Sequence, residues 1–143
     1  MPSEAENKYV ISKLGEEYYG LPIYNVISIE KMGKTTRVPN APDHVTGVTN
    51  LRGEVIPVIN LRRKLGMEEQ EVDKNSRIVI VTVDDIVAGL IVDSSSEVLE
   101  IHKENIDKPP TNENNKFIEY VSGIGKTSDR LIILLNLSKI LEY

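Results

Sequence analysis

Short apolar runs, separated by polar stretches that contain glycine or proline, make up most of the chain. The runs are rich in Val, Ile and Leu, and short segments of this kind bounded by Gly and Pro are typical of β-strands. The strands predicted in this way cover residues 8–14, 18–21, 26–29, 45–51, 54–61, 77–83, 86–92, 98–101 and 130–135. The pattern therefore predicts an all-β protein.

The stretch 45–66, which reads VTGVTNLRGEVIPVINLRRKLG, contains a complete hairpin pattern. Two β-runs flank a tip at residues 50–53, where Asn50 and Gly53 favour a tight turn because Asn and Gly tolerate positive φ angles. Pro57 has no N–H for a β-ladder, so we expect it at a sheet edge or a bulge. The tip should hold Arg52 out into solvent, and residues 61–65 predict one short helical turn after the hairpin.

The second half of the chain repeats the first. The segment 45–65 aligns with 121–141 without a gap, and 6 of the 21 pairs are identical, including Gly47 with Gly123 and Asn60 with Asn136. Upstream of it, 8–21 aligns with 77–90, and a further three-residue insertion aligns 26–29 with 98–101. The same order of elements in both halves is a stronger signal than the identities in any one segment.

This repeat predicts two small β-barrel lobes, residues 8–65 and 77–141, joined by an acidic linker over residues 66–76. A core of that size is marginal on its own, so we expect the lobes to pack on each other through an apolar seam. The alignment leaves open which lobe takes the first strand. The halves differ most at their hairpin tips, where 50–53 aligns with 126–129, and such divergent loops are the better candidates for function.

Charge and composition argue against several classes of function. The 17 Lys plus Arg and 22 Asp plus Glu give a net charge of −5, which argues against sequence-independent nucleic-acid binding. The chain has no cysteine, so disulfides, thiol catalysis and zinc–cysteine sites are not expected. The N-terminal MPSEAENK lacks the apolar segment of a signal peptide, and no run approaches the length of a membrane span. We therefore expect a soluble, cytoplasmic protein that does not insert into the membrane.

No residue pattern predicts catalysis. His44 and His102 have no second ligand at metal spacing, so a surface or capping role is expected for each. The pair Asp84 and Asp85 predicts a turn, because adjacent residues of a strand would point to opposite faces. The sequence has no nucleophile elbow and no glycine-rich phosphate loop. We therefore expect that the protein is not an enzyme and binds no cofactor and no metal.

The basic residues have two interpretations. Arg52 is either a turn arginine that only adds solubility, or a planar donor offered to a carboxylate or carbonyl group of a partner, a role that lysine does not match. The basic run at residues 62–64 is interpreted as a solvated helix face rather than as a site.

The segment GVTNLRGEVIPVINLR resembles the signature of the CheW family of bacterial chemotaxis coupling proteins, which reads G-[VI]-x-N-L-R-G-x-[VI]-x-P-[VI]-[VID]-[DN]-L-R. The similarity continues through YYGLPIYNVISIE, GLIVDSSSEVLEI, residues 120–126 and the ending DRLIILLNLSKIL, and so extends over residues 9–141. It implies two SH3-like five-stranded barrels around a shared apolar centre, and no catalysis. It also implies an adaptor that joins the cytoplasmic tip of a transmembrane chemoreceptor to the regulatory domain of a histidine kinase.

The resemblance also implies site residues. Val26, Gly47 and Arg52 match positions that are linked in this family to receptor coupling. Val26 and Ile27, near the duplicated Val98 and Leu99, are candidates for the wall of an apolar groove that takes an amphipathic receptor helix, with Arg52 at its margin. Plain core packing of Val26 and Ile27 is the alternative.

Other positions bear on the turn and on departures from the family pattern. Asn50 and Gly53 are expected to shape the turn that presents Arg52. Asn60 and Asn136 stand where Asp is commoner in the family, and we expect no loss because Asn also caps helices. Three serines at residues 94–96 replace a more apolar turn.

A small β-barrel that binds nucleic acid or a small ligand is the alternative function. Single-strand binders present exposed aromatic side chains along a basic groove. This chain has only six Tyr, one Phe and no Trp, and it carries a net charge of −5. The adaptor function is therefore preferred, with no nucleic acid among the expected partners.

Overall fold

Every strand predicted from the apolar pattern is present in the structure, a computed structural model that describes residues 7–110 and 116–142. These strands are β1 (Lys8–Leu14), β2 (Glu17–Pro22), β3 (Val26–Lys31), β4 (Val45–Leu51), β5 (Glu54–Asn60), β6 (Arg77–Val83), β7 (Ile86–Val92), β8 (Ser94–Glu100) and β11 (Leu131–Leu135). The apolar pattern does not predict β9 (Ile106–Asp107) or β10 (Val121–Lys126). The short helices are η2 (Ile23–Asn25), α1 (Leu61–Lys64), η3 (Lys103–Asn105), η4 (Lys116–Tyr120) and α2 (Leu137–Ile140).

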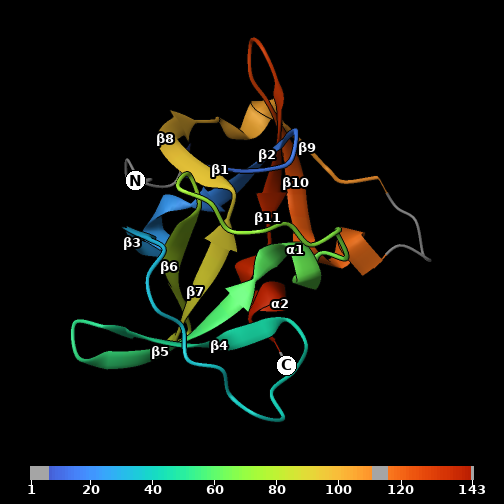
Figure 1. The fold of residues 1–143 in the computed structure, drawn as a ribbon. Helices are drawn as coiled ribbons and strands as arrows, with labels where there is room; N and C mark the ends of the chain where they lie inside the picture. Colours follow the sequence, from blue (N-terminus) through green and yellow to red (C-terminus); the bar gives the residue numbers. More distant parts are fainter. Residues whose placement is uncertain (1–6, 111–115, 143) are drawn as a thin grey trace.

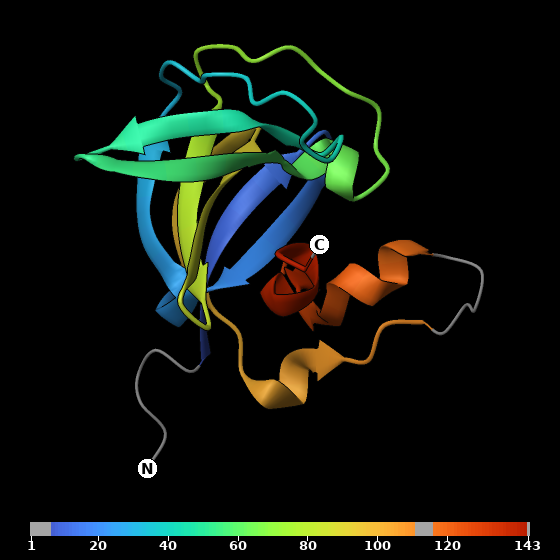
Figure 2. The same ribbon diagram turned by 90° about the horizontal axis from the view of Figure 1, so that it is seen from below.

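The strands form two curved sheets (Figure 1). Sheet A has the order β8-β1-β2-β11-β10-β9, and sheet B has the order β3-β6-β7-β5-β4. The β4–β5 hairpin projects from the body of the molecule in both ribbon views (Figures 1 and 2). The all-β, two-lobed prediction is confirmed. The predicted five strands describe sheet B, whereas sheet A gains a sixth through the two-residue strand β9.

The sheets do not follow the two halves of the chain. Sheet A combines the β1–β2 hairpin of the first half with β8 to β11, and sheet B combines the β6–β7 hairpin of the second half with β3 to β5. The predicted lobes, residues 8–65 and 77–141, are therefore corrected: each lobe takes a hairpin from the other half. The first strand, left open by the alignment, pairs with β8. An internal repeat looks the same whether a hairpin pairs with its own half or with the other, so the sequence does not reveal the exchange.

Two parallel strand pairs join the exchanged hairpins to their sheets. Gly89 in β7 lies opposite Val58 in β5, and Gly20 in β2 lies opposite Leu134 in β11. A Cβ atom at Gly20 would lie 2.7 Å from Cδ2 of Leu134, and one at Gly89 would lie 2.6 Å from Cγ2 of Ile78. Gly20 and Gly89 thus stand at equivalent points of the two hairpins, and both points are too crowded for a side chain. The crowding atoms come from β11 at Gly20 and from β6 at Gly89.

Pro57 lies where β5 has a neighbour on one side only. It is opposite Val48 of β4, whereas the pairing of β5 with β7 begins one residue later, at Val58. The missing N–H of Pro57 thus falls at a local sheet edge, as its chemistry requires.

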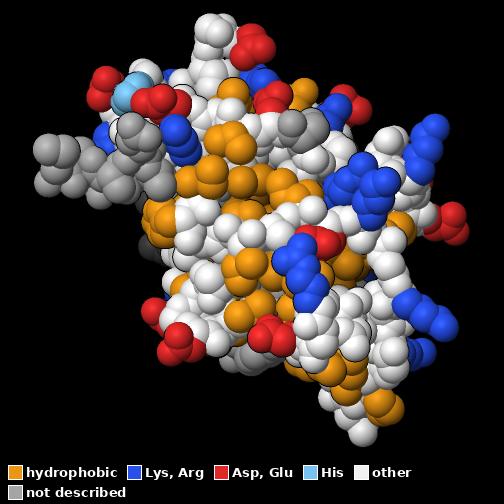
Figure 3. Space-filling model, turned by 90° about the vertical axis from the view of Figure 1, so that its left-hand side faces the viewer, with side chains coloured by type: hydrophobic (Ala, Val, Ile, Leu, Met, Phe, Trp, Pro, Cys, Tyr) orange, Lys and Arg blue, Asp and Glu red, His pale blue; other side chains and the backbone are white. Residues whose placement is uncertain are grey.

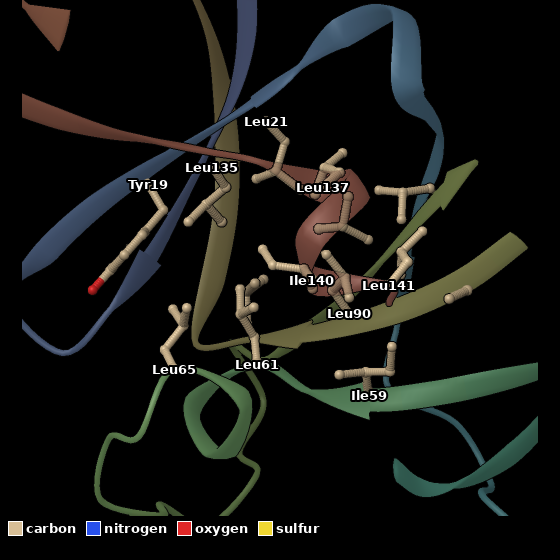
Figure 4. Close-up of a cluster of buried hydrophobic side chains, with 14 of the residues drawn as sticks. Tyr19, Leu21, Ile59, Leu61, Leu65, Leu90, Leu135, Leu137, Ile140 and Leu141 are labelled. Carbon is tan, nitrogen blue, oxygen red and sulfur yellow. The ribbon is translucent and has the colours of Figure 1, made fainter. Parts of the chain in front are cut away.

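The shared core lies between the two sheets (Figure 4). Side chains from both halves of the chain meet there, and Leu21, Leu90 and Leu135 are fully buried or nearly so. Smaller clusters fill each barrel: Ile11, Ile101, Ile132 and Leu134 in sheet A, and Ile56, Ile78 and Ile80 in sheet B. The expected apolar seam is therefore the largest of these clusters. The predicted linker, residues 66–76, contains no helix or strand.

The repeat also extends to the helix caps. Asn60 Oδ1 accepts a hydrogen bond from the backbone N–H of Arg63, and Asn136 Oδ1 accepts one from that of Lys139, each at 3.3 Å. Both asparagines thus cap their helices, α1 and α2, in the way expected of the commoner Asp.

Gly47 is buried beneath the loop that leads from β3 to β4. Thr36 in this loop forms a β-bridge with Val48, with a 2.8 Å hydrogen bond in each direction. A Cβ atom at Gly47 would overlap the carbonyl group of Thr36, whose carbon would be 2.8 Å away. Gly47 therefore holds the loop against the edge of sheet B by leaving room for its backbone.

We predict that Gly47→Ala lowers the free energy of unfolding by about 1–3 kcal/mol, because the Thr36 backbone has to move and its bonds to Val48 weaken. Urea unfolding of the full chain measures the change. Gly33→Ala is the matched control, since no atom lies within 4 Å of a Cβ there, and it should change stability by no more than about 0.5 kcal/mol. Equal stability of the two variants would contradict the packing role of Gly47.

We predict that a chain ending at Glu71 does not fold by itself. It lacks β6 and β7 from the middle of sheet B and four strands of sheet A, so the shared core cannot assemble. Calorimetry should show no cooperative transition, in contrast to a single transition for the full chain. A sharp, independent transition of the truncated chain would contradict the shared-core interpretation.

Candidate protein-binding site

The β4–β5 hairpin ends in a tight turn whose central residues are Arg52 and Gly53, with φ angles of +52° and +90°. Side-chain Oδ1 of Asn50 accepts a 2.9 Å hydrogen bond from the N–H of Gly53. The positive φ angle expected of Gly is present at Gly53, whereas the other one falls on Arg52 and not on Asn50. Asn50 supports the turn through its side chain.

Arg52 extends from this turn into solvent. Its side chain is 74% exposed, and one guanidinium nitrogen lies 3.6 Å from Oε2 of Glu30 in β3. An exposed ion pair at this distance contributes little to stability. The guanidinium group therefore lies beside the edge strand β3 and is accessible to a partner.

Val26 and Ile27 lie at the start of β3, an edge strand of sheet B. The pairing with β6 shifts between Val26 and Ser28, so Ile27 has no partner residue in the ladder. Such bulges redirect side chains. Ile27 is 52% exposed, whereas Val26 is half-buried and packs against the shared core. The core-packing alternative therefore describes Val26, and the exposed position belongs to Ile27.

Exposed apolar side chains gather where β3 and β8 border the molecule. Strand β6 pairs with β3 and also packs against β8, and both ribbon views place β3 and β8 on the same side of the molecule (Figures 1 and 2). We call this region the β3–β8 surface; its exposed apolar residues are Tyr24, Ile27, Ile29 and Val98. Figure 3 shows hydrophobic side chains in a band across the middle of this face, with charged side chains around it.

Residues near this surface differ in how exposed their side chains are. Val98 is 49% exposed and lies opposite the buried Val10. Its neighbour Leu99 instead packs into the cluster inside sheet A. Gly47 is buried and contributes packing rather than a contact surface. The structure thus places Ile27 on β3 and Arg52 beside Glu30 of the same strand. Val98 lies on β8, which packs against β6, the neighbour of β3, and Gly47 lies beneath the surface.

The interpretation of residues 62–64 as a solvated helix face is wrong for Arg62. Its side chain is only 12% exposed and forms a two-pronged ion pair with Asp93. Arg63 fits the interpretation better, since its side chain is 42% exposed and bonds Glu69 and the carbonyl of Asp43. Arg62 and Asp93 are 31 residues apart, and no local pattern connects them.

The remaining polar candidates have structural roles. Asp84 and Asp85 adopt φ angles of +48° and +68° at the tip of the β6–β7 hairpin, so the predicted turn is confirmed. His102 lies 3.2 Å from Glu100 at the surface. Partial burial, together with the charge of Lys64, lowers the pKa of His44.

Two searches over residues 7–110 and 116–142 bear on metal and membrane binding. Within these ranges no three His, Asp or Glu side chains are grouped as metal ligands would be. The same ranges contain no helix with the length and apolar content to cross a membrane.

Comparison with known proteins places the chain in a family. Residues 8–143 match the family model described as a CheW-like domain. The chain is 40% identical over 130 residues to the chemotaxis protein CheW of Helicobacter pylori, covering 90% of this chain and 78% of that protein. It is 35% identical over 135 residues to the chemotaxis protein CheW of Klebsiella aerogenes, covering 94% and 81%.

A solved structure agrees with this match. The crystal structure of the scaffolding protein TtCheW from Thermoanaerobacter tengcongensis superposes with a TM-score of 0.87 at 38% sequence identity, covering 100% of this chain and 91% of that one. Sequence and fold therefore agree over most of the chain, and the protein belongs to the family of CheW-like domains.

Proposed function

We propose that this protein is a non-enzymatic adaptor in bacterial chemotaxis, which joins the cytoplasmic tip of a chemoreceptor to the regulatory domain of a histidine kinase. Membership of the CheW-like family, relatives named chemotaxis proteins and a neighbour named a scaffolding protein support this role. Family membership and the net charge of −5 favour it over a barrel that binds nucleic acid or a small ligand. The proposed place of action is the cytoplasm, where both partners present their binding domains.

The receptor contact is proposed at the β3–β8 surface. An amphipathic helix binds an apolar strip with a polar rim. Ile27 and Val98 supply exposed apolar side chains, and Arg52 with Glu30 supplies a charged margin. A planar guanidinium that is accessible at this margin suits a carboxylate or carbonyl oxygen of the receptor helix.

The kinase contact is proposed at a barrel end, away from the β3–β8 surface. The kinase domain shares this double-barrel fold by family resemblance, and two barrels can pair through strand ends and hairpin tips. Val55 and Leu131 are 70% and 62% exposed at the starts of β5 and β11, and the internal repeat aligns them with each other. Val55 shares its hairpin tip with Arg52, whereas Leu131 lies on the separate β10–β11 hairpin. Leu131 is therefore the candidate for this pairing.

We predict that Arg52→Ala and Arg52→Glu weaken binding to a receptor cytoplasmic fragment by about tenfold or more, because a hydrogen bond to a charged group contributes about 1.5–3 kcal/mol. Stability should change by no more than about 0.5 kcal/mol, as for other solvent-facing turn residues. Titration calorimetry with the receptor fragment and, separately, with the kinase regulatory domain measures both affinities.

Lys126→Ala is the matched control for Arg52. Lys126 is an exposed cation at the related β10–β11 tip, 3.3 Å from Asp107, and its removal should leave receptor binding unchanged. If wild-type protein binds neither partner, the adaptor proposal fails. Equal loss of both partners in Arg52→Ala would show that one surface serves both.

We predict that Ile27→Lys weakens receptor binding more than kinase binding, with little change in the melting temperature, because the exposed Ile27 side chain does not support the core. Ile86→Lys is its control, since Ile86 is a comparably exposed β-strand isoleucine at the β6–β7 tip. A lower melting temperature together with equal loss of both partners would overturn the assignment of the β3–β8 surface.

A further inference from the structure

The chain crosses between the sheets at two short connections. The first is η2, which leads from β2 in sheet A to β3 in sheet B, and the second is Asp93, which leads from β7 in sheet B to β8 in sheet A. Each connection starts one of the strands that border the β3–β8 surface. Pairing with β1 and β6 holds the lengths of β8 and β3, and the two connections hold the points where these strands begin.

Both connections are tied to equivalent points of the exchanged hairpins. Side-chain Nδ2 of Asn25 donates to the carbonyl of Thr82 at 2.9 Å, and the N–H of Asp93 donates to the carbonyl of Lys13 at 3.0 Å. Thr82 and Lys13 are aligned with each other by the internal repeat. The two hydrogen bonds thus share equivalent acceptor positions, although one donor is a side-chain amide and the other is a backbone N–H.

The second connection has an additional ionic clamp. The carboxylate of Asp93 accepts hydrogen bonds from Nε of Arg62 at 3.0 Å, from a terminal nitrogen of Arg62, and from the N–H of Gly15 at 2.7 Å. Arg62 also donates to the carbonyl of Glu68 at 2.9 Å and to Oε1 of Gln70 at 2.6 Å. One guanidinium group thus links α1, the linker, the connection before β8 and, through Asp93, the β1–β2 turn.

The clamp is charged and partly buried, since the Arg62 side chain is 12% exposed and that of Asp93 is 31% exposed. Partial burial alone would raise the pKa of Asp93, but the hydrogen bonds from Arg62 and Gly15 outweigh it and hold this pKa below its ordinary value. The carboxylate is therefore ionised at neutral pH, and a two-pronged pair with arginine also fixes its orientation.

The clamp has no counterpart in the second half of the chain. In the second half of the chain Ser138 takes the position of Arg62, and α2 forms there with the same asparagine cap as α1. The clamp thus occurs in only one of the two equivalent halves. Such a difference is expected of a feature that serves function rather than folding in general.

We propose that Arg62 is a positioning residue for the receptor contact: by holding Asp93, it sets the place where β8 begins and so the spacing between Ile27 and Val98. This inference rests on the proposed function of the β3–β8 surface. It assigns Arg62 no contact with the receptor.

A distance measurement tests the positioning without any partner. The chain has no cysteine, so Ile27→Cys and Val98→Cys, both at exposed positions, accept one spin label each. Pulsed electron resonance should give a narrow distance distribution in the otherwise unchanged chain, and a shifted or clearly broader one with Arg62→Gln or Asp93→Asn. Lys64→Gln, a neighbouring change on α1, should leave the distribution narrow.

The Asp93→Asn variant keeps the size of the side chain and an acceptor for Gly15. It therefore keeps the test decisive if Arg62→Gln does not fold. Measurements are made at a temperature where circular dichroism shows each variant to be folded. An unchanged distribution in a folded clamp variant would overturn the proposal.

Binding to a receptor cytoplasmic fragment, measured under the same conditions, tests the consequence. Arg62→Gln should lose about tenfold or more in receptor affinity and Arg62→Lys less, while affinity for the kinase regulatory domain stays the same. Unchanged receptor affinity with a changed label distance would overturn the positioning role. If wild-type protein does not bind the receptor fragment, the proposed function fails, whereas the distance measurement still decides whether the clamp sets the spacing.

Discussion

Neither sheet is complete without a hairpin from the other half of the chain. The exchanged hairpins carry Leu21 and Leu90 into the shared core, where both side chains are fully buried. Fully burying a leucine is worth about 1.5–3 kcal/mol, so each half depends on the other for a large part of its stability. Because the core couples the sheets in this way, the edges and hairpin tips can vary without endangering the fold.

Positions that the two halves share have other roles than positions found in one half only. The glycines at the two parallel joints and the asparagine caps of α1 and α2 occur in both halves, and each has a packing or capping reason. Arg52 and Arg62 have no counterpart, since Ser128 and Ser138 stand at the aligned positions. One of these arginines is exposed beside β3 and the other is buried at a connection between the sheets. The features that distinguish the halves are thus charged groups at the border of the β3–β8 surface.

The sequence predicts the strands well because their signals are local. Runs such as 77–83 and 86–92 appear in the structure with the same bounds. Strand β8 begins earlier than predicted, at Ser94, because its serine-rich start pairs with β1, and the hydroxyls of Ser12 and Ser95 lie 3.2 Å apart. Such polar pairing gives no apolar signal.

The sequence does not predict which elements pair with each other in the fold. The exchange of hairpins is hidden because the repeat is compatible with either partner. The exposed position of Arg52 follows from its place in a hairpin turn, but the burial of Arg62 depends on Asp93, which a separate part of the chain brings close. Ile27 is exposed and Val26 is not, because a bulge interrupts the pairing of β3 with β6 between Val26 and Ser28. The residues around Ile27 do not predict this bulge.

The hairpin exchange also bears on how such a protein can arise. A single ancestral half could have completed its sheet by trading hairpins with an identical copy, as domain-swapped dimers do. Such a symmetric pair has two identical ends and can only present the same surface twice. In one joined chain each end can differ from the other, and here one tip has an arginine where the other has a serine. Gene fusion thus turns a symmetric assembly into one with two unlike faces, the least that a molecule needs to connect two different partners.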